Sequence, residues 1–90
     1  MKKVLISVSG IDTTGIIARI ATKLYEMNIN ILDISQTILS GCFTMMMAVD
    51  IGNSGRSFAE VMDELIPLGK SMGMEIHMQR MDIFEAMHQI

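Results

Sequence analysis

The chain has 90 residues, which is enough for one small domain, so we expect a single domain over 1–90. A net charge of −3, with only one tyrosine and three phenylalanines, argues against a nucleic-acid-binding protein, because basic residues supply most of that attraction. Half of the residues are hydrophobic and the mean hydropathy is +0.41. Isolated domains seldom leave large apolar patches in water, so this surplus predicts a partner subunit.

The compartment follows from three features of the sequence. The longest stretch without a charged residue, 34–49, has 16 residues, against the ~20 that a membrane-spanning helix needs. A signal or transit peptide is not predicted, since Lys2 and Lys3 precede only a short strand-like apolar run. The single cysteine, Cys42, has no partner for an internal disulfide, which fits a reducing compartment. We therefore expect a cytoplasmic protein that does not bind membranes.

The first half of the chain predicts a strand, a helix and a second strand. Alternating apolar residues predict a strand over 2–9, and the loop SGIDTTG ends it. A helix is expected up to Met27 and Asn28, because apolar residues then recur at helical spacing: Ile16, Ile17, Ile20, Ala21 and Leu24. Residues 30–39 return to a period of two, with one face made of Ile31, Asp33, Ser35, Thr37 and Leu39.

The second half predicts a hairpin, a helix, a strand and a tail helix. A glycine turn at 40–42 leads into a strand whose inward residues are Phe43, Met45, Met47, Val49 and Ile51. Ser57 and Glu60 have the spacing of a capping box that opens a helix. Pro67 is expected to kink or end that helix, and Gly73 to stop it. A strand over 74–80 follows, and a further capping pattern at 82–85 predicts a short C-terminal helix.

The order of these elements predicts an α+β fold, a ferredoxin-like βαββαβ sandwich. Its four-stranded antiparallel sheet carries two helices on one face, and the short C-terminal helix is an addition. Several apolar residues are expected on the sheet face away from the helices: Leu5, Ile31, Leu39 and Met46. A second subunit, the tail helix or edge-to-edge sheet pairing would shield them, so we predict a homodimer without choosing its geometry.

The loop SGIDTTG holds the candidate functional residues. Residues 10–15 have the spacing of a phosphate-binding P-loop, but Ile16 and Ile17 stand where lysine and Ser/Thr are needed, which excludes that function. Two interpretations remain open. In the first, Asp12 or Thr13 only caps the helix. In the second, the helix N-terminus also receives a carboxylate and Asp12 an ammonium group, which makes a site for a zwitterion.

Catalytic and metal sites are not predicted. Adjacent methionines in Met45-Met46-Met47 point to opposite faces of a strand, so they are expected to fill the core rather than bind copper. Cys42 has no Cys or His at ligand spacing, and His77 is expected on a solvated sheet face. The first loop lacks the arginine of an acylphosphatase and the cysteine pair of a metal chaperone. The open sheet face lacks the aromatic residues of an RNA-binding module.

A set of short motifs follows the chain in a characteristic order. An apolar strand runs into Gly10-x-Asp12-x-x-Gly15 and then IIA at 16–18, and NINI at 28–31 stands at the second strand. This set resembles the ACT domains, small regulatory modules that sense amino acids and similar effectors. Further segments look like the compact stand-alone ACT proteins of bacteria and archaea: ISQT at 34–37, FTMM at 43–46 and IFEAM at 83–87. The resemblance covers nearly the whole chain.

The resemblance implies where a ligand would bind. In the family, effectors lie between the loop after the first strand and the start of the second strand, commonly at a dimer interface. Transferred to this chain, the implied residues are Gly10, Ile11, Asp12, Thr13, Thr14 and Gly15, with Asn30, Ile31 and Asp33 opposite. Thr14 stands where many ACT domains have proline, and so leaves an additional N–H and hydroxyl facing the site.

Together these observations predict a non-enzymatic regulatory protein that needs no cofactor. We expect a homodimer that binds an amino acid or related small carboxylate and acts through its dimer packing or a protein partner. The alternative is a protein–protein interaction module of the same fold that binds no effector.

Overall fold

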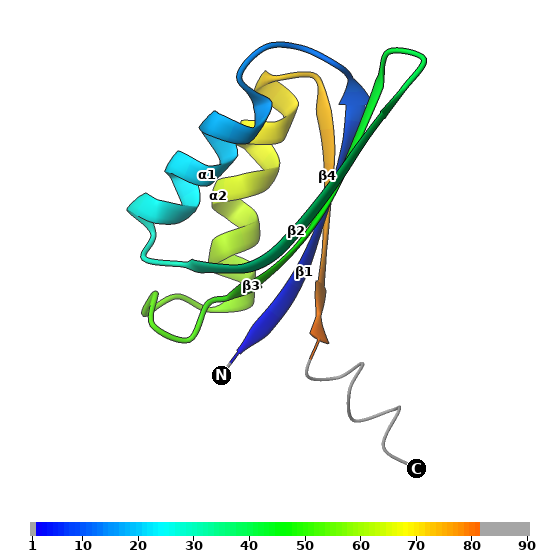
Figure 1. Cartoon of the computed structure of the whole chain (residues 1–90). Helices are drawn as coiled ribbons and strands as arrows, with labels where there is room; N and C mark the ends of the chain where they lie inside the picture. Colours follow the sequence, from blue (N-terminus) through cyan, green and yellow to red (C-terminus); the bar gives the residue numbers. More distant parts are fainter. Residues whose placement is uncertain (1, 82–90) are drawn as a thin grey trace.

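The computed structural model describes residues 2–81. Its elements follow in the order β1 (Lys3–Ile11), α1 (Ile16–Glu26), β2 (Asn30–Leu39), β3 (Cys42–Asp50), α2 (Phe58–Ser71) and β4 (Met74–Arg80). The strands form one antiparallel sheet in the order β2-β3-β1-β4, and both helices lie on one face of it (Figure 1). The predicted ferredoxin-like fold is therefore confirmed. The predicted tail helix, residues 82–90, lies outside the described residues.

The two central strands supply the middle of the core, because their alternate side chains face the helices. Three directly opposed pairs are each at most 1% exposed: Val4 with Val49, Ile6 with Met47 and Val8 with Met45. The helix residues that cover them are fully buried: Ile20, Leu24, Val61 and Leu65. The interpretation of Met45 and Met47 as core residues is confirmed.

In the β2–β3 hairpin, β2 has the predicted bounds, β3 begins and ends one residue earlier than predicted, and one face assignment was wrong. Ser40 and Gly41 both have positive φ (52° and 78°), as a two-residue type I′ hairpin turn requires. A β-bulge places Leu32 as an extra residue between Ile31, opposite Val49, and Asp33. Directly opposed residues share a face, so Ile31 lies on the helix face with the core and not on the open face.

Helix α2 begins as predicted but continues further than predicted. Ser57 Oγ accepts from the Glu60 amide (3.2 Å), and the Glu60 carboxylate accepts from the Ser57 amide (2.9 Å), which completes the capping box. Pro67 does not end the helix, which runs on to Ser71. Pro67 and Asp63 are both exposed, so water can solvate the Asp63 carbonyl that lacks an N–H partner. Gly73, at φ 73°, follows the end of the helix as expected.

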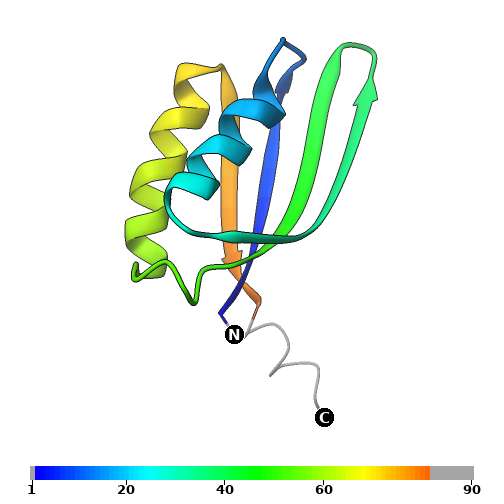
Figure 2. The ribbon, with the colours of Figure 1, turned by 60° about the vertical axis from the view of Figure 1, so that its left-hand side comes forward.

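The hairpin carries much of the exposed apolar surface. Figure 2 shows that its distal part stands to the side of both helices. Ile34 and Ile38 face the helix side of the sheet, because they pair with the core residues Met47 and Phe43. They remain 43% and 54% exposed because neither α1 nor α2 covers this part of the hairpin. On the opposite face, Leu39 and Met46 are exposed as predicted, while Leu5 is half-buried. Exposed apolar patches of this kind are typical of contact surfaces between proteins.

Candidate functional site at the start of the first helix

The candidate loop begins later than the sequence suggested, because β1 includes Gly10 and Ile11. Gly10 pairs with Phe43 on one side and Met74 on the other. A Cβ built on Gly10 would lie 2.7 Å from the carbonyl oxygen of Gly73 and 2.9 Å from the Met74 side chain. The missing side chain of Gly10 is thus explained by the close approach of the turn before β4, and not by room for a ligand.

The interpretation of Asp12 or Thr13 as the helix cap was wrong. The N-cap residue of α1 is Gly15, with φ 86°, and no side-chain hydrogen bond caps the helix. Asp12 and Thr13 precede the position from which a cap side chain reaches the first amides. The backbone of Asp12 is instead held by the hairpin turn, because its amide donates to the carbonyl of Gly41 (2.9 Å).

The N-terminus of α1 is open to solvent. Its first intrahelical hydrogen bond runs from the Arg19 amide to the Gly15 carbonyl (3.0 Å), so the three preceding amides, at residues 16–18, have no acceptor within the helix. The first turn contains no acidic residue, and a Cβ on Gly15 would meet no atom within 4 Å. Neither a side-chain cap nor a first-turn acid offsets the positive end of the helix macrodipole, and a helix end of this kind favours a bound carboxylate.

Residues 11–15, which directly precede α1, are all exposed and carry three kinds of groups. Asp12 carries a carboxylate, and Thr13 and Thr14 carry hydroxyl groups. Ile11, which is 81% exposed, adds apolar surface at the end of β1. A zwitterion with an apolar side chain has complementary groups for each of them.

The second group of predicted residues lies at the other end of the sheet. Asn30 pairs with Asp50, which pairs with Lys3 at the start of β1, whereas residues 10–15 lie at the end of β1 and directly after it (Figure 1). At ~3.3 Å per residue, the nine residues of β1 separate the two ends by roughly 25 Å. One copy of the chain therefore does not bring the two groups together.

The three predicted residues at the start of β2 do not share one site, because each has different contacts. Asn30 lines a small pocket of about 220 Å³ with Tyr25, Asn28, Ile29, Asp50 and Asn53. Ile31 packs against the core, and the carboxylate of Asp33 accepts from the Ile34 amide (2.9 Å). Of the three, Asn30 and Asp33 are exposed and Ile31 is half-buried.

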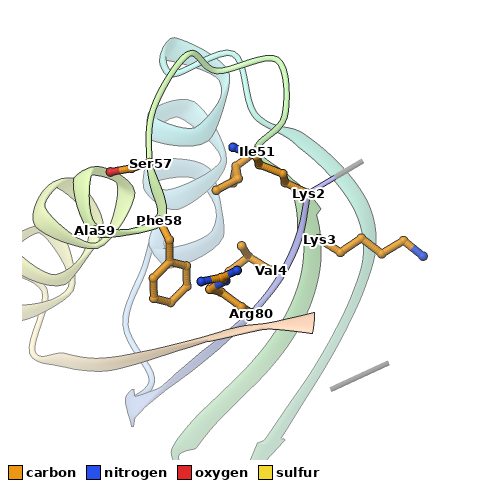
Figure 3. Close-up of a pocket in the computed structure, with 8 residues that line it drawn as sticks. All are labelled: Lys2, Lys3, Val4, Ile51, Ser57, Phe58, Ala59 and Arg80. Atoms are coloured by element: carbon orange, nitrogen blue, oxygen red, sulfur yellow. The ribbon is translucent and has the colours of Figure 1, made fainter. Parts of the chain in front are cut away.

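A pocket that the sequence reasoning missed lies at this same end of the sheet. It has a volume of about 440 Å³ and is lined by Lys2, Lys3, Val4, Ile51, Ser57, Phe58, Ala59 and Arg80 (Figure 3). The sequence carries one signal for it, the lysine pair at the start of the chain, but such a pair is equally typical of a targeting sequence. The pocket could not be read from spacing, because its residues come from four separate segments.

Within residues 2–81, no cluster of three or more His, Cys, Asp or Glu side chains is placed to hold a metal ion. Neither helix of this part of the chain is long and apolar enough to cross a membrane. Cys42 is exposed in the strand after the hairpin turn.

Comparison with known proteins identifies the fold family. The sequence matches the ACT domain family over residues 2–79. The chain belongs to the ACT domain family. ACT domains are commonly regulatory domains that bind small-molecule effectors and form dimers, and proteins of this kind are typically not catalytic.

The relatives place the chain among the small stand-alone ACT proteins. It is 49% identical to a UPF0237 protein of Bifidobacterium longum and 48% identical to one of Methanocaldococcus jannaschii, in each case over all of both chains. An ACT domain protein from Streptococcus pneumoniae has a similar solved structure, with a TM-score of 0.83 and 37% identity. That alignment covers 93% of this chain and 94% of the other.

Proposed function

We propose that this ACT protein is a non-enzymatic, cytoplasmic regulator that binds an amino acid or a related small carboxylate at residues 10–15. The observation that supports the proposal is the contrast between the two helices. The first amides of α2 meet the capping box of Ser57 and Glu60, whereas those of α1 meet neither a side-chain cap nor a first-turn acid. A ligand carboxylate would supply the acceptor that α1 lacks.

The surrounding residues fit the other groups of an amino acid. The ligand's ammonium group would contact the Asp12 carboxylate, and its side chain would meet Ile11 and Ile17, both of which are exposed. Gly15 leaves the approach to the amides open. Thr14, which has an amide N–H that proline would lack, adds one more donor in the loop.

A homodimer would complete the site. Because Asn30 and Asp33 lie at the opposite end of the sheet from residues 10–15, only a second copy can bring them to the loop. Strand β2 is an edge strand, and its ladder groups and exposed Ile34 and Ile38 provide a surface on which two copies can pair in opposite directions. A ligand at such a junction would change the packing of the dimer, and a partner protein would sense that change.

A thermal-shift panel of the twenty amino acids and small carboxylic acids tests the proposal. A ligand at 100 times its Kd adds ~2.7 kcal/mol to the free energy of unfolding, which raises Tm by about 10–20 °C in a domain of this size. The variant Asp12→Ala should remain folded and lose the shift, while Asp63→Ala, an exposed carboxylate on α2, should keep it. If no compound raises Tm, the effector-binding proposal is wrong.

The exposed hairpin also supports the alternative function, an interaction module without an effector. Leu39 at 73% and Ile38 at 54% exposure lie beside the turn of this hairpin. The distal part of the hairpin stands to the side of both helices (Figure 2). If substitutions there abolish binding to a partner protein while no small molecule shifts Tm, the interaction module is the better description.

A further inference from the structure

A hollow follows the outer side of β4, the strand at the edge of the sheet opposite to β2. Helix α2 runs beside this strand (Figure 2). The hollow has a volume of about 560 Å³, and its lining comes from α2, from β4 and from the open face of β1. It therefore extends from the helix layer around the edge strand to the uncovered face of the sheet.

The lining of this hollow is mainly apolar and only partly covered. Met62 and Ile66, which lie one helical turn apart on α2, are half-buried, as is Met78 on β4. Met78 lies opposite the core residue Ile6 and so faces the helices, whereas Leu5 lines the hollow from the open face. Proteins usually cover an apolar edge strand, because its free ladder groups otherwise pair with other chains. This edge therefore calls for a cover.

The segment that follows β4 has the sequence and the length to provide this cover. Residues 82–90 carry apolar side chains at helical spacing, with polar residues between them: Ile83, Phe84, Met87 and Ile90. Because β4 ends at Arg80, this segment starts beside the hollow, whose β4 residues are 76–79. Nine residues of helix are ~13 Å long, and the four strand residues span ~10 Å, so the two lengths match.

We propose that residues 82–90 fold back against β4 and α2 of the same chain and place Phe84 in the hollow. The apolar surface beside the hairpin turn is out of reach of a helix of this length, because Ile11 lies ~23 Å along β1 from Val4, the residue opposite Arg80. The chain would thus cover the β4 edge itself and leave the β2 edge for a second copy or a partner protein. A docked tail does not require a bound effector.

Nuclear Overhauser contacts in the unmodified full chain test this packing. Contacts are expected between the ring protons of Phe84 and the methyl groups of Met62, Ile66 and Leu5. An isotope-filtered experiment on mixed labelled and unlabelled chains should lack these contacts, because they lie within one chain. Their appearance in the filtered experiment would show that the tail of a second copy fills the hollow, and would overturn the proposal. Phe84 contacts confined to Leu39 and its neighbours, or no contacts between Phe84 and residues 2–81, would overturn it too.

A double-mutant cycle measured by thermal unfolding gives an independent test. Phe84→Ala should lower Tm by about 4 °C or more, because it removes a buried aromatic side chain, whereas Glu85→Ala on the polar side of the segment should have a much smaller effect. Met62→Ala should lower Tm less in the Phe84→Ala background than in the wild type, since residues in contact are coupled. Leu39→Ala, remote from the hollow, should have the same effect in both backgrounds. Additive effects of Phe84→Ala and Met62→Ala would contradict docking in this hollow.

Discussion

Replacing Gly10 with alanine separates a structural role for this glycine from a ligand-binding role. Gly10 does not have positive φ, so alanine there costs no backbone strain. Alanine also lowers the conformational entropy of the unfolded chain, and this effect alone would stabilise the protein by ~0.4–1 kcal/mol. The new Cβ, however, would stand 2.7 Å from the Gly73 carbonyl oxygen, a backbone atom in the turn that precedes β4. Overpacking of this kind costs ~1–3 kcal/mol, so the predicted net effect is destabilising.

Urea unfolding followed by circular dichroism measures this effect, and a thermal scan gives an independent value. At ~4–8 °C per kcal/mol, a net loss of about 1–2 kcal/mol lowers Tm by about 4–16 °C. Gly15→Ala is the matched comparison, because its Cβ meets open space and only its left-handed φ of 86° costs ~1–2 kcal/mol. A Gly10→Ala protein as stable as the wild type, or more stable, would refute the proposed close contact with Gly73.

Four further predictions follow from the helices and from β2. Ser57→Ala should lower the free energy of unfolding by about 1 kcal/mol in urea titrations, because it removes half of the capping box. The Ser57 amide also donates to the Glu60 carboxylate and so holds the pKa of Glu60 below its ordinary 4.5. The stability that this hydrogen bond contributes is therefore present above pH 4.5 and is lost as the pH falls through the pKa of Glu60 in the folded state. When the pH is lowered, the free energy of unfolding of Glu60→Gln should therefore fall less than that of the wild type. Pro67→Ala should raise Tm by restoring a helical hydrogen bond, and an unchanged or lower Tm would contradict this. Ile34→Lys should convert a dimer to a monomer in analytical ultracentrifugation, while Tyr25→Lys on α1 should not.

The element order and the bounds of two strands could be predicted, because they depend on local periodicity. Residues 30–39 and 74–80 are strands with the predicted limits, and the Ser57 capping box lies where its spacing indicated. The face assignment of Ile31 failed because the bulge at Leu32 shifts the alternation by one residue. A bulge depends on pairing with β3, which the period of β2 alone does not reveal.

The candidate site was harder to predict for a related reason. Whether Asp12 caps α1 depends on the hydrogen bond between its amide and Gly41, which is distant in sequence. The role of Gly10 likewise depends on the turn at Gly73. The separation of Asn30 from residues 10–15, by contrast, follows from topology, since β1 and β2 run in the same direction on either side of β3.

The most direct measurement of effector binding is an amide chemical-shift titration with the compound that gives the largest rise in Tm. The open N-terminus of α1 predicts the largest shifts at the amides of residues 16–18, with smaller ones at 11–15, and a loss of all of them in Asp12→Ala. Saturable binding that leaves these amides unmoved would contradict the assignment of the effector to this loop.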